Sequence, residues 1–173
     1  MPEDRRASIR RQATLPFVWR EVAESATVPE LCRTLGLPAA LALQSRLAEL
    51  DEEYQRLCAS VADTRVLDVL RVLDRKVAAL EEAIVAEAPQ PERRPLVISP
   101  DGVGFDASER VPEGTWLALH VVLPVSYHVV CKARVSHCAA HDGGYRIGAE
   151  FHQMQAPAGR RLTRYAIGRD RDT

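Results

Sequence analysis

The sequence opens with a cluster of arginines whose spacing could bind a nucleotide. In the stretch RRASIRRQATLP, which runs from Arg5 to Pro16, four of the first seven residues are arginines, and Arg6 and Arg10 lie four residues apart. A guanidinium group is planar and permanently charged, so it can clamp a phosphate, donate to the O6 and N7 atoms of guanine, or stack on a base. Two arginines at this spacing could hold one guanine nucleotide; by composition alone, a solvated basic tail is the alternative.

Other candidate residues do not form the pattern of an active site or a metal site. The stretch SYHVVCKARVSHCAAH offers histidines and cysteines as zinc ligands, but on a single strand His128 and His137 would lie about 30 Å apart. The segment SPDGVG is not followed by a helix, as a phosphate-binding loop would be. Ser99 in this segment is not in the GxSxG context of a nucleophilic serine. We therefore expect a protein that is not an enzyme and that carries neither a metal nor a cofactor.

The composition excludes several further classes. The chain has 173 residues, with 23 basic and 24 acidic side chains and a formal net charge of -1, so DNA and RNA are not expected partners. Because the sequence shows neither a signal-peptide pattern nor an apolar run of about 20 residues, we expect a cytoplasmic protein without membrane insertion. Its four cysteines are scattered through apolar segments and are expected to be free thiols.

A long helical segment is predicted between residues 25 and 90, since neither glycine nor proline occurs from Ala39 to Glu87. Two heptad patterns run through this segment, and because their phases do not join, we expect a break near Asp63 and Thr64, either of which can cap the second helix. The heptad positions, which form the predicted oligomer interface, are Leu43, Leu47, Leu50, Tyr54, Leu57 and Val61, followed by Val66, Leu70, Leu73, Val77, Leu80 and Ile84.

The helices could form a hairpin packed on their own domain or a coiled coil between subunits. The second pattern is flanked by Leu67, Val69 and Val72, so its apolar stripe is too wide for one partner helix. We favour self-association, because the stripe would otherwise stay exposed. The heptad residues alone leave dimer and tetramer open, since Val77 with Leu73 favours two strands and the wide stripe favours more.

The rest of the chain alternates with the period of two that is typical of strands. With one strand before the helices, these segments predict an α+β fold with a small six-stranded antiparallel β-barrel, an inserted coiled-coil segment and a C-terminal helix opened by Pro157. The expected parts are residues 1–24 and 91–173 for the barrel and 25–90 for the insertion. The predicted strands are Leu15–Val22, Pro95–Ser99, Gly102–Asp106, Thr115–Leu123, Tyr127–Ala139 and Tyr145–Met154.

These residues together resemble the PilZ domain family of bacterial cyclic di-GMP receptors. That family opens with RxxxR and a five-residue step to a strand beginning Leu-Pro, which Arg6, Arg10 and Leu15 match. Its second motif, [DN]xSxxG, is matched by Ser99 and Gly102 in VISPDG, with Val97 at the Asp or Asn position. The resemblance continues in GVGF, YRIGAEF and RRLTRYAIG and covers about residues 5–22 and 93–170.

The resemblance implies a non-catalytic cyclic di-GMP receptor in which Arg6, Arg10, Ser99 and Gly102 contact the ligand. Its helical insertion is similar to that of the atypical tetrameric branch, so a tetramer is preferred over a dimer, with a downstream protein partner in motility or secretion machinery. Val97 cannot make the expected hydrogen bond, which would cost about 1–3 kcal/mol, roughly ten- to a hundredfold in affinity. The alternative is an oligomeric PilZ-like scaffold that has lost cyclic di-GMP.

Overall fold

The computed structural model describes residues 9–38, 41–86, 88–152, 154 and 156–168. Its strands are β1 (Arg11–Glu21), β2 (Arg93–Ile98), β3 (Gly102–Ala107), β4 (Trp116–Leu123), β5 (Tyr127–His141) and β6 (Gly144–His152). Its helices are α1 (Val28–Thr34), α2 (Leu41–Cys58), α3 (Thr64–Ala86) and α4 (Ala156–Ala166). The order of elements agrees with the predicted fold class, a six-stranded antiparallel barrel interrupted by helices after its first strand.

The six strands form a closed barrel in the order β1-β2-β3-β6-β5-β4. The long strand β1 closes it, because Arg11–Pro16 pair with β2 and Phe17–Glu21 pair with β4. β1 begins at Arg11, four residues before the predicted start at Leu15. The residues Arg11–Thr14 become a strand because they pair with β2. Their own β-propensity is low overall, so the sequence did not predict this part of the strand.

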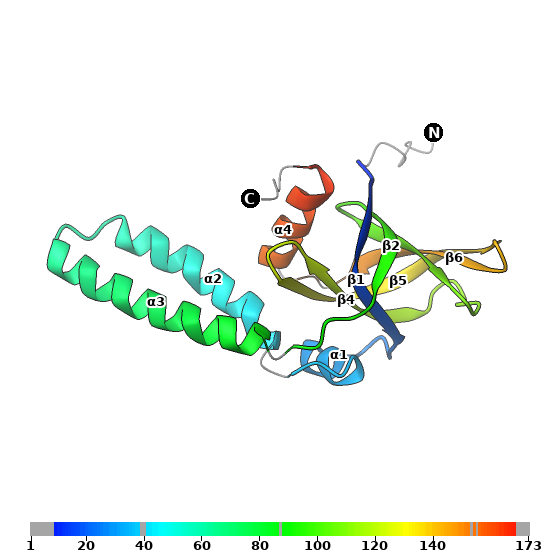
Figure 1. Ribbon diagram of the computed structural model, residues 1–173, viewed down its shortest axis with the longest axis horizontal. Helices are drawn as coiled ribbons and strands as arrows, with labels where there is room; N and C mark the ends of the chain where they lie inside the picture. The colour runs from blue at the N-terminus through cyan, green and yellow to red at the C-terminus, as the bar shows by residue number, and fades with distance from the viewer. Residues whose placement is uncertain (1–8, 39–40, 87, 153, 155, 169–173) are drawn as a thin grey trace.

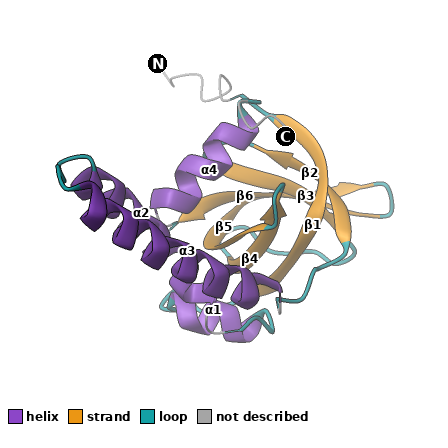
Figure 2. Ribbon diagram, turned by 60° about the vertical axis from the view of Figure 1, so that its left-hand side comes forward, coloured by secondary structure: helices purple, strands orange, loops and turns teal. Residues whose placement is uncertain are grey.

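The barrel interior is filled by the side chains that the period of two directs inward. Phe17, Phe105, Leu119, Cys131 and Ile147 are buried there, each from a different strand. The apolar side of α4 joins the same core through Leu162, Tyr165 and Ala166. On the other side of the barrel, α1 packs against β4 and β5 (Figure 1, Figure 2).

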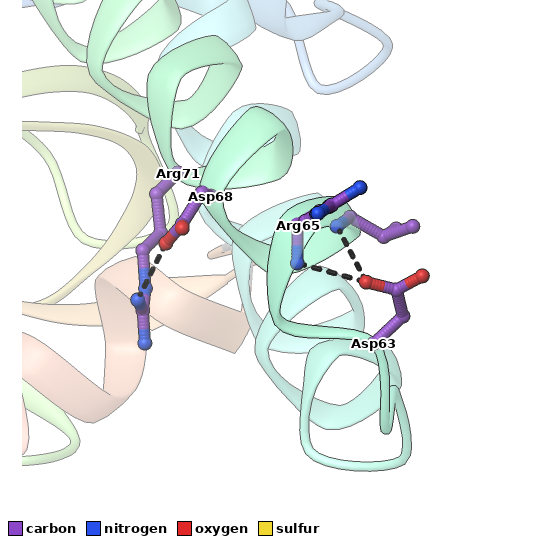
Figure 3. A network of polar contacts seen from close by, with 5 residues as sticks. Asp63, Arg65, Asp68 and Arg71 are labelled. Carbon is purple, nitrogen blue, oxygen red and sulfur yellow. Dashed lines mark hydrogen bonds and ion pairs between the residues drawn. The ribbon is translucent and has the colours of Figure 1, made fainter.

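The two long helices form a hairpin that projects away from the barrel, with the connecting residues 59–63 at its far end (Figure 1). The predicted break is confirmed: the Asp63 carboxylate accepts hydrogen bonds from the backbone N–H groups of Arg65, at 2.8 Å, and Val66, at 3.4 Å (Figure 3). This is the N-cap arrangement that satisfies donors in the first turn of a helix.

The hairpin divides the predicted heptad positions into two sets. Leu47, Tyr54, Val61 and Leu70 are half-buried, whereas the following positions are exposed: Leu43, Leu50, Leu57, Val66, Leu73, Val77 and Leu80. The Ile84 side chain lies outside the described part of the structure. Contact between α2 and α3 therefore leaves an apolar stripe, made by these exposed positions together with Val69 and Val72, uncovered in a single chain.

Candidate functional site

A groove of about 840 Å³ lies on the outer face of the barrel, where β2, β3, β6 and β5 are neighbours and β1 begins. It is formed by outward-facing residues of these strands, by the β2–β3 turn, and by the core residues Val103, Ile147 and Ala149 that alternate with the outward-facing ones. The lining residues are Arg10, Val97, Ser99, Asp101, Gly102, Val103, Gly104, Ser136, His137, Arg146, Ile147, Gly148, Ala149 and Glu150.

The groove brings together three of the four residues predicted to contact a ligand. Arg10, exposed, directly precedes Arg11, which pairs with Ile98, so Arg10 and Ser99 are neighbours at the end of the β1–β2 ladder. Gly102 starts the next strand at the same end of the groove. Arg6, the fourth residue, lies outside the described residues.

Ser99 and Gly102 hold the turn between β2 and β3. The Ser99 backbone N–H donates to the Gly102 carbonyl at 2.9 Å, and the Ser99 hydroxyl accepts from the Gly102 N–H at 3.1 Å. A Cβ atom on Gly102 would lie 2.5 Å from the Ala149 carbonyl oxygen of β6, so only glycine fits there. The SxxG match thus has a structural basis in this turn as well as a position in the groove.

Val97 lies in the groove, half-buried, two residues before Ser99 on the same outward face of β2. It is an apolar side chain where the family motif has a carboxylate or an amide. Asp101, in the turn, also lines the groove.

Arg146 lines the groove from β6 and was not predicted from the sequence. Its guanidinium donates at 2.8 Å to the carboxylate of Asp106, the residue directly opposite it on β3. Both residues occupy outward positions of strands whose inward positions carry the apolar pattern. That alternation could have placed Arg146 on the outer face, but its pairing with Asp106 depends on the register of two strands 40 residues apart.

His137 and Glu150 were not predicted as groove residues either. His137 follows a register shift in β5, between Val135 and His137, which directs both Ser136 and His137 to the groove. Glu150 pairs with Gly102 of β3 and stands beside the turn. A bulge of this kind has no signal in the sequence pattern.

A second polar cluster lies away from the groove, on the face of β4 and β5 that α1 packs against. The buried rings of His120 and His128 are stacked, with His120 Nε2 and His128 Nδ1 at 2.9 Å. Burial, and to a lesser extent the neighbouring His128, lowers the pKa of His120 to about 4, and burial also lowers the pKa of His128. This pair is neutral near pH 7 and contributes to packing.

Within the described residues, no group of three or more histidine, cysteine or acidic side chains could hold a metal ion. Among these residues there is also no helix long and apolar enough to span a membrane.

The protein contains a small antiparallel barrel with a candidate ligand site on its outer face. The residues at the beginning of β1 and in the β2–β3 turn form one end of this site. The PilZ domain family model matches residues 83–168, from the end of α3 to the end of α4. This chain therefore carries a PilZ domain, as the resemblance predicted, and its barrel also includes β1, before the matched region. PilZ domains are a family of non-catalytic cyclic di-GMP receptor domains.

Solved structures with similarity to this chain include the following two. One is a Xanthomonas campestris protein described as a new tetrameric PilZ domain self-assembled via an unusual helical bundle, with 13% identity, a TM-score of 0.57, and coverage of 94% of this chain and 88% of that one. The other is the Bacillus subtilis inhibitor of motility, MotI/DgrA, with 20% identity, a TM-score of 0.41, and coverage of 44% of this chain and 41% of that one. The search of curated proteins found no match.

Proposed function

We propose that this protein is a non-catalytic cyclic di-GMP receptor that self-associates through its helical hairpin and signals to a protein partner. The groove carries this proposal, because Arg10, Ser99 and Gly102 meet there although Arg10 and Ser99 lie 89 positions apart in the chain. Arg6 and Arg10 would clamp phosphate and contact guanine, while the turn at Ser99 lines the opposite wall.

Self-association is supported by the apolar stripe on the hairpin. Leu50 is 52% exposed, Leu73 51% and Leu80 66%, and such a row on a projecting hairpin is typical of an interface between chains. The Xanthomonas campestris protein, which has the same fold, is described as assembling into a tetramer via a helical bundle, so we expect a tetramer here.

The output of the receptor would be a changed surface at the groove. A cyclic dinucleotide held between the N-terminal arginines and the β2–β3 turn would cover residues that are exposed in the free protein, including Arg10 and Asp101. A partner protein of motility or secretion machinery would then recognise the covered or the open form of this surface.

Calorimetric titration of the full chain with cyclic di-GMP tests the receptor function. We expect saturable heat for the wild type and a loss of at least tenfold in affinity for Arg10→Ala, because a charge-assisted contact to phosphate is removed. Arg20→Ala is the matched control: Arg20, in β1, is an exposed arginine like Arg10, but it does not line the groove. No heat up to about 100 µM nucleotide would refute the receptor.

Val97 favours a second candidate, an oligomeric scaffold that has lost cyclic di-GMP. In that case the wild type would assemble without binding, whereas Val97→Asp would restore a carboxylate beside Ser99 and gain affinity of roughly ten- to a hundredfold. An assembled wild type that shows no binding, together with a Val97→Asp variant that binds, would establish the scaffold.

A further inference from the structure

A row of paired residues crosses five strands of the barrel, and its members on β2, β3, β6 and β5 form the middle of the groove. Each residue of this row is the register partner of the next one on the neighbouring strand. From β1 through β2, β3 and β6 to β5, the residues are Gln12, Val97, Gly104, Gly148 and His137. The two central residues are glycines, so the floor of the groove is bare backbone between the Val97 and His137 side chains.

The barrel does not require glycine at either central position. If Gly104 carried a Cβ atom, its nearest neighbour would be the Cβ atom of Val97, at 3.6 Å. A Cβ atom on Gly148 would have the Cβ atom of His137 as its nearest neighbour, at 3.5 Å. These are ordinary van der Waals contacts, and neither glycine has a positive φ. Because glycine weakens a strand, a glycine that packing does not require indicates close approach by another group.

Arg146 stands at one end of this floor. It lies two residues before Gly148 on the same face of β6, about 7 Å along the strand at about 3.3 Å per residue. The Asp106 carboxylate, at 2.8 Å, holds the guanidinium and balances its charge. The guanidinium has five N–H donors, so several remain for a second partner.

The distribution of charge separates the two ends of the groove. At the Ser99 end, Arg10 makes no ion pair among the described residues, so its charge is available for an anion, although the carboxylates of Asp101 and Glu150 also line this end. At the other end, the charge of Arg146 is already balanced by Asp106, which suits the uncharged acceptor edge of a base. The O6 and N7 atoms of guanine form such an edge, and adenine lacks the O6 acceptor.

We propose that a guanine ring lies flat on Gly104 and Gly148, between Val97 and His137, and that Arg146, oriented by Asp106, donates to its O6 and N7 atoms. This inference rests on the proposed receptor function and assigns the base-reading part of the site. Arg146 is then the residue that distinguishes guanine from adenine, and the Val97 side chain packs against the edge of the ring.

Titrations with cyclic di-GMP and cyclic di-AMP test this assignment in the full chain. Arg146→Ala is expected to weaken cyclic di-GMP roughly ten- to a hundredfold while leaving cyclic di-AMP unchanged, so that the preference for guanine collapses. Arg146→Lys is not expected to restore the preference, because an ammonium lacks the paired donors of a guanidinium. A residue with a merely structural role would weaken both nucleotides alike.

Gly148→Ala tests the floor independently. The added methyl group fits the barrel but occupies the surface on which the ring would lie, so cyclic di-GMP affinity should fall at least tenfold at unchanged stability. The matched control is Gly159→Ala in α4, where a Cβ atom would likewise make only ordinary contacts, the nearest at 3.6 Å, outside the groove. This control should bind as the wild type does.

The outcomes separate the two proposals. If Arg10→Ala weakens binding whereas Arg146→Ala and Gly148→Ala bind both nucleotides as the wild type does, the base-reading site is wrong and the receptor stands. If the wild type binds neither dinucleotide, guanosine monophosphate is added to isotopically labelled protein. If the NMR signals of the Gly104 and Gly148 amides then shift, the guanine site is supported and the receptor function is refuted. If these signals do not change, both the guanine site and the receptor function are refuted.

Discussion

At the residue scale, Gly102 serves the barrel whether or not a ligand binds. In Gly102→Ala, the new Cβ atom would meet the Ala149 carbonyl oxygen at 2.5 Å, and β3 would have to move away from β6. We expect a loss of about 1–3 kcal/mol in the free energy of unfolding, measured in urea.

The control for this prediction is Gly104→Ala on the same strand, where the nearest atom would lie at 3.6 Å. This variant should unfold at or slightly above the wild-type urea midpoint, because alanine also restricts the unfolded chain. Equal stability of the two variants would contradict the steric account of Gly102.

The buried histidine pair makes stability depend on pH. Because the pKa of His120 is lowered to about 4 in the folded chain, the unfolded chain takes up protons first as the pH falls from about 6.5. Stability should therefore be full above pH 6.5 or so and decline towards about pH 4, by up to about 3 kcal/mol.

Thermal unfolding across this pH range checks the prediction. His120→Gln removes one titrating group but keeps a side chain that can hydrogen-bond to His128, so its stability should decline less steeply with acid. A variant profile parallel to that of the wild type would show that other groups control the acid sensitivity.

At the element scale, α3 depends on the cap that separates it from α2. Asp63→Ala removes the acceptor for the N–H groups of Arg65 and Val66, and we expect a loss of about 1 kcal/mol in the free energy of unfolding.

Asp68→Ala is the matched control within the same helix. Among the described residues, the Asp68 side chain forms an ion pair with Arg71 at 3.2 Å and no other polar contact. Both side chains are at least 70% exposed, so removing Asp68 should cost no more than about 0.5 kcal/mol (Figure 3). If both variants lose the same stability in urea, the capping role of Asp63 is wrong.

At the scale of the whole molecule, the hairpin's apolar stripe should be covered by further copies of the chain. Leu50→Lys combined with Leu73→Lys places charges on this stripe, one on each helix, and both side chains are exposed in the single chain. We expect the wild type to sediment as a tetramer and the double variant as a smaller species, with the barrel still folded.

The control for the assembly is Glu53→Lys together with Arg75→Glu, which changes charge on exposed residues of the same two helices without altering an apolar position. This control should remain a tetramer. A wild-type monomer at tens of micromolar would rule out self-association through the hairpin, and a wild-type dimer would correct only its stoichiometry.

Many of the helices and strands can be predicted from local sequence patterns. The alternation in β3 to β6, the Pro157 start of the last helix and the change of heptad phase at Asp63 each depend on neighbours in the chain, so they predict elements from sequence alone. The beginning of β1 is different, because Arg11–Thr14 become a strand through pairing with β2, about 80 residues later.

The sequence by itself determined the barrel-type pattern, the interrupted heptads and the arginine and SxxG residues of the candidate site. Only the tertiary structure decided that Arg10 adjoins Ser99, that Arg146 pairs with Asp106, and that two glycines meet on the groove floor. The reason is strand register: a shift of one residue turns every side chain to the other face, and long-range ladders set that register.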